Sequence, residues 1–106
     1  MTRALVYSPE AVADLERIFW FIAADSPERG LAYIERIRGA CRGLCDAPMS
    51  GSARPDLGKE VRILPLWRRI VVAYRVQPER IEVLRVFSAG QDYQAIMASR
   101  PEGRAE

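Results

Sequence analysis

The residues of this sequence best suited to chemistry are arginines. They make up fifteen of the sixteen basic residues, and the C-terminal part, residues 47–106, holds ten basic against seven acidic groups. A guanidinium is a permanent charge with a planar fork of donors that matches carboxylates and phosphates. The pattern predicts an acidic polypeptide or a nucleic acid as partner. The alternative is a solvated sheet face on which arginines pair with Glu79, Glu82 and Asp92.

The absence of histidine excludes Ser-His and Cys-His nucleophile pairs and removes the commonest general base. Gly51, Gly58 and Gly90 are isolated and do not form a phosphate-binding loop, so we expect no nucleotide cofactor. Cys41 and Cys45 lie four residues apart in a helical pattern, where neighbouring turns hold them too far apart for a disulfide. We expect two buried, reduced thiols, no metal and no cofactor.

For two side chains in the basic half of the chain, the sequence predicts a specific environment. Arg85 interrupts an apolar run, so it should be partly buried and paired, with Asp92 or Glu60 as the partner. Trp67 precedes two arginines, a combination found in interface hot spots and nucleic-acid contacts, although the ring could equally cover the edge of the core. Replacing Arg85 with alanine should destabilise the fold or a complex that depends on it.

The elements that must position these residues follow from periodicity. Residues 4–7 form a β-prone run, and Ser8-Pro9 is typical of a helix start. Leu15, Ile18, Phe19 and Ile22 then mark one helical face, with Asp14, Glu16 and Arg17 on the other side. Trp20 and Phe21, beside the apolar face, suggest core or oligomer packing. A second start at Ser26-Pro27 opens another helix, and the short link favours a helical hairpin.

Beyond a loop over residues 49–58, three runs rich in β-branched residues predict strands at 61–64, 69–76 and 81–87. Residues 77–80 are short enough to close an antiparallel hairpin. On the middle strand, Arg69 and Arg75 should share a partly polar face with Val71 and Ala73.

The predicted fold is therefore α+β, in the order β-α-α-β-β-β, with an N-terminal helical hairpin packed on one face of an antiparallel sheet. We expect a single domain over residues 1–98 and a frayed tail over residues 99–106. No apolar run approaches a membrane span, and residues 1–6 lack the pattern of a signal peptide, so a cytoplasmic protein without membrane contact is expected.

Short motifs in order over residues 5–93 resemble ParE-type toxins of the RelE/ParE superfamily. They are Tyr7-Ser8-Pro9-Glu10-Ala11, the pair Pro48 and Gly51, Arg54-Pro55-Asp56-Leu57-Gly58, Val61-Arg62, Leu64-Pro65, Tyr74-Arg75-Val76 and Ile81-Glu82-Val83-Leu84-Arg85-Val86. The resemblance implies a toxin of a type II toxin-antitoxin module that binds DNA gyrase and blocks it. It also implies a ParD-like antitoxin that folds onto the toxin in a hetero-oligomer, with any contact to DNA only indirect.

The candidate residues for target or antitoxin binding are Arg54, Arg62, Trp67, Arg68, Arg69, Arg75, Arg85 and Tyr93. Ser88 and Gln91 depart from the family, which often carries histidine and a basic residue near these places.

Two other readings of the resemblance remain open. A RelE-like enzyme would cut messenger RNA on the ribosome with Arg62, Arg85 and Tyr93. Arginine would stabilise charge there, and Tyr93 or a carboxylate would have to act as the base. Replacing Tyr93 with phenylalanine would then abolish cleavage but leave gyrase-directed toxicity. The third reading is an inactive homologue that only binds antitoxin.

Overall fold

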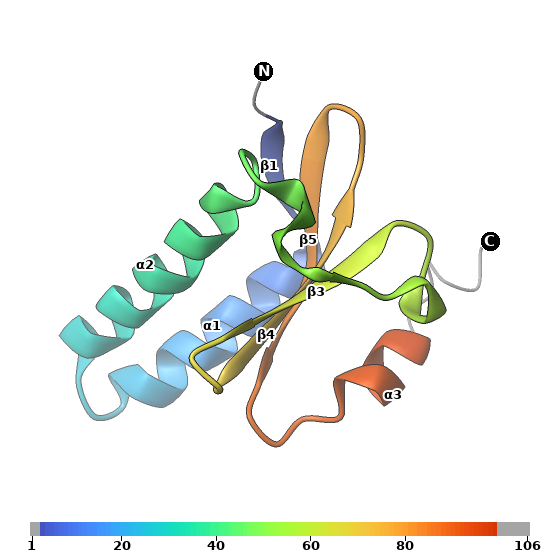
Figure 1. Cartoon of the computed structure of the whole chain (residues 1–106). Coiled ribbons are helices and arrows are strands. Elements are labelled where there is room, and N and C mark those ends of the chain that lie inside the picture. The colour runs from blue at the N-terminus through green and yellow to red at the C-terminus, as the bar shows by residue number, and fades with distance from the viewer. Residues whose placement is uncertain (1–2, 100–106) are drawn as a thin grey trace.

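The structure, a computed structural model, describes residues 3–99 and has the predicted α+β architecture (Figure 1). Its helices and strands are β1 (Ala4–Tyr7), α1 (Pro9–Ala23), α2 (Pro27–Gly43), β2 (Ser52–Ala53), β3 (Val61–Leu66), β4 (Ile70–Val76), β5 (Arg80–Ser88) and α3 (Tyr93–Ala98). Two 3-10 turns, η1 (Pro48–Ser50) and η2 (Pro55–Leu57), lie in the loop before β3. The sequence did not predict β2, α3 or these turns. Apart from Ser99, which caps α3, the tail predicted to fray lies outside the described residues.

The five strands form one mixed sheet in the order β1-β5-β4-β3-β2. The β3–β4 and β4–β5 pairs are antiparallel, as predicted, but β1 lies parallel to β5, with Leu5 opposite Ile81. The expectation of a wholly antiparallel sheet is therefore wrong for this edge. Strand pairing across 76 residues depends on where the helical hairpin returns the chain, and no local sequence pattern records that.

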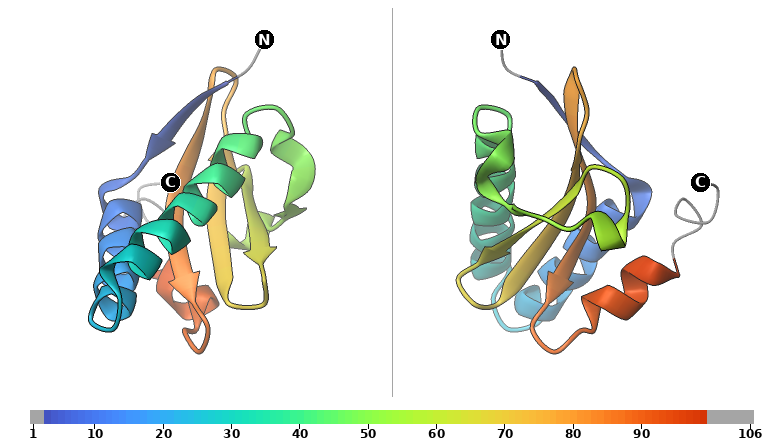
Figure 2. Two further views of the ribbon diagram at one scale, coloured as in Figure 1. Left: turned by 90° about the vertical axis from the view of Figure 1, so that its left-hand side faces the viewer. Right: turned by 45° about the vertical axis from the view of Figure 1, so that its right-hand side comes forward.

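The α1–α2 hairpin covers one face of the sheet (Figures 1 and 2). Both predicted caps are present: the Ser8 hydroxyl accepts a hydrogen bond from the Ala11 N–H, and the Ser26 hydroxyl accepts one from the Arg29 N–H. Gly30 allows the helices to approach closely, because a Cβ there would lie 3.1 Å from the Phe19 ring. The core beneath the hairpin consists of Ala11, Leu15, Ile18, Ile37, Cys41 and Leu44 against Ile70, Val72, Tyr74, Ile81, Val83 and Val86.

The opposite face of the sheet carries a second apolar cluster. Its buried members are Val61, Ile63, Ala73, Leu84, Phe87 and Met97, the last from α3. Val71 and Ala73 do share this face, as the alternation predicted, but Ala73 is fully buried, so the middle of the face is apolar. Helix α3 covers this second apolar cluster. The sequence did not predict α3 because six residues are too few to show a helical period.

A β-bulge lies between β4 and β5, where Ala73 faces Arg85 and Tyr74 faces Val83. Leu84 is the extra residue, so the strand no longer alternates strictly across this point. Val83 and Val86 both belong to the core under the helices, while Leu84 and Phe87 belong to the second cluster. The bulge thus changes the direction of the Arg85 side chain from the one that strict alternation along β5 would give.

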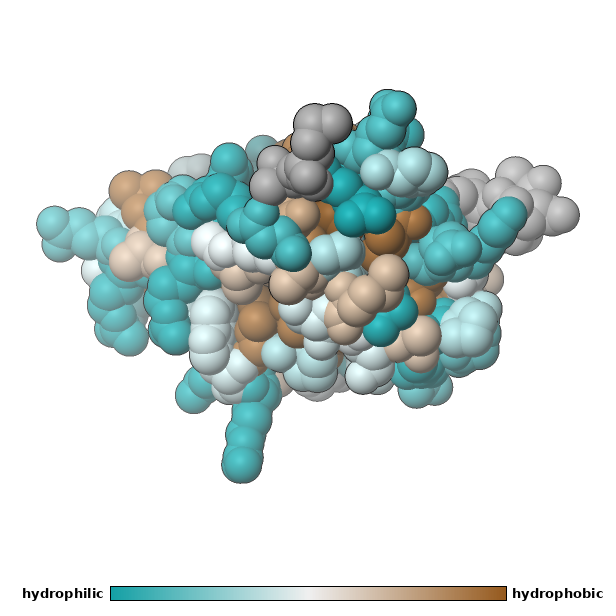
Figure 3. Space-filling model, turned by 45° about the horizontal axis from the view of Figure 1, so that its top comes forward, coloured by the Kyte–Doolittle hydropathy of each residue, from teal (hydrophilic) through white to brown (hydrophobic). Residues whose placement is uncertain are grey.

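Two aromatic side chains of α1 do not join either cluster. Trp20 is 68% exposed and Phe21 is 83% exposed. The prediction of core packing is therefore wrong for both, and oligomer packing stays a prediction. Viewed toward the end of the sheet where β4 turns into β5, the surface is mostly hydrophilic with small separate apolar areas (Figure 3).

Candidate functional site

Arg85 is paired with Asp14, a buried carboxylate on α1. Arg85 Nε and Nη2 donate to the two Asp14 oxygens at 2.8 and 3.0 Å, and the Val86 N–H donates to Asp14 at 2.8 Å. The side chains are only 18% and 6% exposed. The hydrogen bonds that Arg85 donates to Asp14 raise the pKa of Arg85, although burial opposes this. The predicted partners Asp92 and Glu60 are therefore wrong.

The sheet edge explains why a helix provides this carboxylate. Strand β1 ends at Tyr7, opposite Val83, so no strand of the described residues continues along the outer edge of β5 beyond that point. Ser8 anchors the start of α1 by donating from its hydroxyl to the Leu84 carbonyl at 2.8 Å. The next turn of α1 then presents Asp14 to the Val86 N–H as a substitute for a neighbouring strand.

Arg62 holds the loop that precedes β2. Its Nε donates to the Gly51 carbonyl at 2.8 Å, and the Gly51 N–H donates to the Tyr74 hydroxyl at 2.9 Å. Tyr74 in turn donates to the Pro48 carbonyl at 2.7 Å. A Cβ at residue 51 would lie 2.4 Å from the Ile63 carbonyl oxygen, so only glycine fits. Arg62 therefore has a structural role in this loop.

Arg54 and Tyr93 are brought together beside η2. The Arg54 guanidinium binds both Asp56 oxygens, at 2.9 and 2.8 Å, and donates to the Tyr93 hydroxyl at 3.4 Å. These hydrogen bonds raise the pKa of Arg54, and the bond from Arg54 lowers the pKa of Asp56. Tyr93 also packs on Phe87, with ring centroids 5.8 Å apart. The cluster ties α3 to the loop.

The three residues of the RelE-like set are each engaged elsewhere. Arg85 binds α1, Arg62 binds the loop backbone, and Tyr93 accepts from Arg54. Within residues 3–99, no hydrogen bond or ring contact between side chains joins one member of this set to another.

The two residues that depart from the family pattern are joined to each other. The Gln91 side-chain oxygen accepts from the Ser88 N–H at 2.7 Å and from Arg17 Nη2 at 3.2 Å. Arg17 lies on α1, and its Nη2 also donates to the Val86 carbonyl at 3.5 Å. Through Arg17, Gln91 therefore connects the turn before α3 to α1.

Trp67, Arg68 and Arg69 form the turn between β3 and β4. Trp67 is 40% exposed, and Arg68 and Arg69 are also exposed. Arg36 Cζ lies 4.1 Å from the centroid of the Trp67 ring, so the ring packs on α2 rather than in the core. The turn brings together three of the predicted binding residues.

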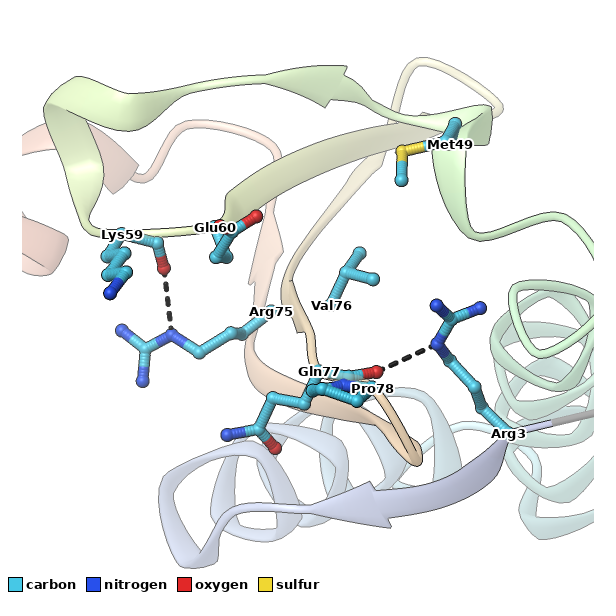
Figure 4. Close-up of a pocket in the computed structure, with 8 residues that line it drawn as sticks. All are labelled: Arg3, Met49, Lys59, Glu60, Arg75, Val76, Gln77 and Pro78. Atoms are coloured by element: carbon cyan, nitrogen blue, oxygen red, sulfur yellow. Dashed lines mark hydrogen bonds between the residues drawn. The ribbon is translucent and has the colours of Figure 1, made fainter.

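Arg75 lies in a separate basic pocket of about 690 Å³, at the end of the sheet near β1 (Figure 4). Arg75 Nε donates to the Lys59 carbonyl at 3.0 Å, and Arg3 Nε donates to the Gln77 carbonyl at 2.8 Å. The full lining is Arg3, Met49, Lys59, Glu60, Arg75, Val76, Gln77 and Pro78. Three cationic residues against one acid surround an apolar centre. Arg3 and Lys59 were missed from the sequence because they join Arg75 only through the fold.

No metal or covalent chemistry is indicated by the remaining groups. Over residues 3–99, no three His, Cys, Asp or Glu side chains are grouped closely enough to hold a metal ion. Cys41 and Cys45 are free thiols; Cys41 is buried, as predicted, but Cys45 is only half-buried, so the prediction of burial is wrong for it. Burial raises the pKa of Cys41 to about 11 and also raises that of Cys45, which keeps both thiols protonated at neutral pH. In the described part of the chain, no helix has the length and apolar character to cross a bilayer.

The whole arrangement matches a known family. The sequence profile described as "ParE toxin of type II toxin-antitoxin system, parDE" matches residues 5–93. The chain belongs to the ParE toxin family. A solved ParE-type relative, from the "Chromosomal ParDE TA system from P. aeruginosa", is 27% identical, with 82% of this chain and 96% of that chain covered and a TM-score of 0.68. No curated protein matches the chain. The predicted resemblance is confirmed.

The partner of Arg85 was missed although the sequence carried a signal for it. Asp14 was expected on the exposed side of α1, yet it is buried, 5% exposed. Its spacing from Ala11 and Ile18 is three and four residues, which places all three on one helical face. A carboxylate at such a position should be read as the partner of a buried arginine elsewhere.

Proposed function

We propose that this ParE-family protein inhibits DNA gyrase by binding it in the cytoplasm, and that a ParD-like antitoxin neutralises it. The observation that carries the proposal is the match to the ParE family across the whole described fold, from β1 to the start of α3. Membership in this family is consistent with an inhibitor that needs no catalytic side chain.

The contacts of the candidate nuclease residues favour binding over catalysis. Arg62 and Arg85 each already donate from Nε and Nη2 to backbone or carboxylate partners inside the fold. The Tyr93 hydroxyl accepts a hydrogen bond from Arg54 and is therefore also engaged inside the fold. A RelE-like reaction would therefore require these residues to leave their present partners.

The basic pocket supports an antitoxin partner. Arg3, Lys59 and Arg75 surround the apolar side chains of Val76 and Met49 (Figure 4). A peptide that carries carboxylates on either side of an apolar residue would match this arrangement in charge and shape. We place the antitoxin segment here, in a hetero-oligomer with the toxin.

The first test is a supercoiling and cleavage assay with purified gyrase, relaxed plasmid, ATP and the antitoxin-free protein. Lost supercoiling together with accumulated linear DNA is the expected result. No effect from folded protein would overturn gyrase inhibition. A ribosome-dependent mRNA cleavage assay on the same sample would then separate a RelE-like nuclease from an inactive homologue.

The antitoxin site has its own test. Reversing the charge of the exposed Lys59 in Lys59→Glu should weaken antitoxin affinity at least tenfold and leave gyrase inhibition unchanged. Arg42→Glu, on the exposed surface of α2, is the matched control and should leave the affinity unchanged. Equal affinity of the Lys59→Glu variant and the native chain would place the antitoxin elsewhere.

A further inference from the structure

The turn between β3 and β4 has a backbone conformation that its residues do not favour. Trp67 and Arg68 have φ angles of 53° and 61°, and the Arg69 N–H donates to the Leu66 carbonyl at 3.0 Å. Two successive left-handed residues are the requirement of a type I′ turn, where Asn-Gly is the usual sequence. Bulky residues persist in this region only where their surroundings fix them, and such positions are often functional.

The indole ring of Trp67 is held from one side and left open on another. Its centroid lies 5.8 Å from that of the Tyr33 ring and 4.1 Å from Arg36 Cζ, both on α2. It nevertheless remains 40% exposed. The ring is thus presented to solvent in a fixed orientation, which lowers the entropy lost when a partner binds.

Four arginines lie on this turn and on the side of α2 that contacts Trp67, and we call them with Trp67 and Tyr33 the hairpin-tip surface. Arg68 and Arg69 are exposed on the turn, and Arg36 lies on the ring. Arg29 is exposed on the same face of α2, since Arg29, Tyr33 and Arg36 are spaced by four and three residues. The turn lies at the end of the sheet away from the N-terminus and from the basic pocket (Figure 2).

This surface contains no acidic member. The two carboxylates of α2, Glu28 and Glu35, are each next in sequence to an arginine of the surface but do not share its helical face. Glu35 instead lies 3.7 Å from Arg38 and 3.6 Å from Arg42. The four guanidiniums therefore present charge of a single sign, and arginine does not lose it at any physiological pH.

We propose that the hairpin-tip surface binds DNA directly, with its arginines on the phosphate backbone and the Trp67 ring against a sugar or base. Single-sign arginine clusters with an exposed aromatic ring are typical of nucleic-acid binding. An acidic protein is less well matched, because protein interfaces have cores depleted in charge and surrounded by apolar contacts. Apart from Trp67, the large exposed apolar side chain nearest in sequence to this surface is Leu31 on α2, which lines a groove with Val12 and Phe19 of α1 instead. The proposal goes beyond gyrase inhibition and departs from the expectation that DNA is contacted only indirectly.

Salt dependence gives the expected size of the effect. Each phosphate neutralised on duplex DNA contributes a slope of roughly −0.9 to log K against log salt. Four arginines then give a slope of about −3.6, so affinity should fall roughly 150-fold between 50 and 200 mM salt. Removing two of them should halve the slope to about −1.8 and reduce the fall to roughly 12-fold.

The test is fluorescence anisotropy of a labelled 20-base-pair duplex with the full chain over this salt range. The variant Arg68→Asn with Arg69→Gln removes two charges, and asparagine tolerates the left-handed turn, so the fold is retained. Its matched control is Arg38→Gln with Arg42→Gln, which removes the same charge from exposed positions on another face of α2. The proposal expects the slope to halve in the first variant and to stay unchanged in the control.

Other outcomes overturn the proposal. Equal slopes in the two double variants would show that net charge alone is being measured. Absence of binding by folded native chain at 50 mM salt would remove the DNA site. Binding of poly-glutamate but not of duplex would assign the surface to an acidic polypeptide. Because this measurement contains no gyrase, its result is independent of whether the chain inhibits the enzyme.

Discussion

Replacing Asp14 with alanine should lower the stability of the protein by about 3–4 kcal/mol. The carboxylate accepts two hydrogen bonds from Arg85 and one from the Val86 N–H, and its side chain is only 6% exposed. The substitution leaves a partly buried guanidinium and a buried backbone donor without an acceptor.

The magnitude follows from the separate losses. Breaking a buried ion pair costs about 3–5 kcal/mol, and an unsatisfied buried N–H costs about 1–3 kcal/mol. The Arg85 side chain is 18% exposed, so water can restore part of its hydration and the sum is an upper limit. A residual stability within the usual range of about 5–15 kcal/mol would still allow the variant to fold.

Urea unfolding followed by tryptophan fluorescence measures this change. With a slope of about 1.5 kcal/mol per molar urea, the midpoint should fall by about 2 M or more. Arg85→Ala and the double variant complete a cycle, whose coupling energy should be about 2 kcal/mol. Arg17→Ala is the control, because Arg17 approaches Asp14 only to 3.5 Å with a side chain 43% exposed. Its cost should stay below about 1 kcal/mol.

Two results would refute the reasoning. A loss below about 1 kcal/mol for Asp14→Ala would mean that the buried carboxylate is not a determinant of stability. An additive cycle would mean that Asp14 and Arg85 act independently, despite the 2.8 Å separation of their atoms.

Three further predictions concern the loop, the turn and the buried thiol. Tyr74→Phe should cost about 2 kcal/mol in urea unfolding, because the Pro48 carbonyl and the Gly51 N–H both lose the hydroxyl; a cost near zero would show that water replaces it. Arg68→Gly should raise stability by about 1 kcal/mol, seen as a higher thermal midpoint, because glycine adopts a φ of 61° without strain; a lower midpoint would contradict this. Stability should decline as pH rises from about 9 to about 11, because the unfolded state ionises the Cys41 thiol first while the folded state retains its proton. Cys41→Ala should make the decline shallower, most clearly between about pH 9 and 10, because above about pH 10 the raised pKa of the Tyr7 hydroxyl also lowers stability. An unchanged pH profile would assign the decline to other groups.

Local patterns accounted for the elements whose signals lie within a few residues of each other. The caps at Ser8 and Ser26, the helical hairpin and the antiparallel strands on either side of residues 77–79 were all predicted and are all present. The ordered motifs over residues 5–93 identified the family without any structure.

The candidate site was predicted less completely. Arg54 and Tyr93 do meet, and Trp67 does share a turn with Arg68 and Arg69. The partner of Arg85 was wrong, because the choice between acidic residues required knowing which one the helix brings to the free edge of β5. The sequence did not predict the basic pocket, because its cationic residues come from three segments that are far apart in the chain.

The sequence by itself determined the arginine-rich character, the lack of histidine chemistry and the order of the main elements. These depend on composition and short-range periodicity, which are properties of the chain alone. Only the tertiary structure decided that β1 lies parallel to β5, that α3 covers the second face, and that Arg85 pairs with Asp14. Each of these contacts joins residues far apart in the chain, and the free energy that selects them comes from burial and hydrogen bonding in the assembled fold.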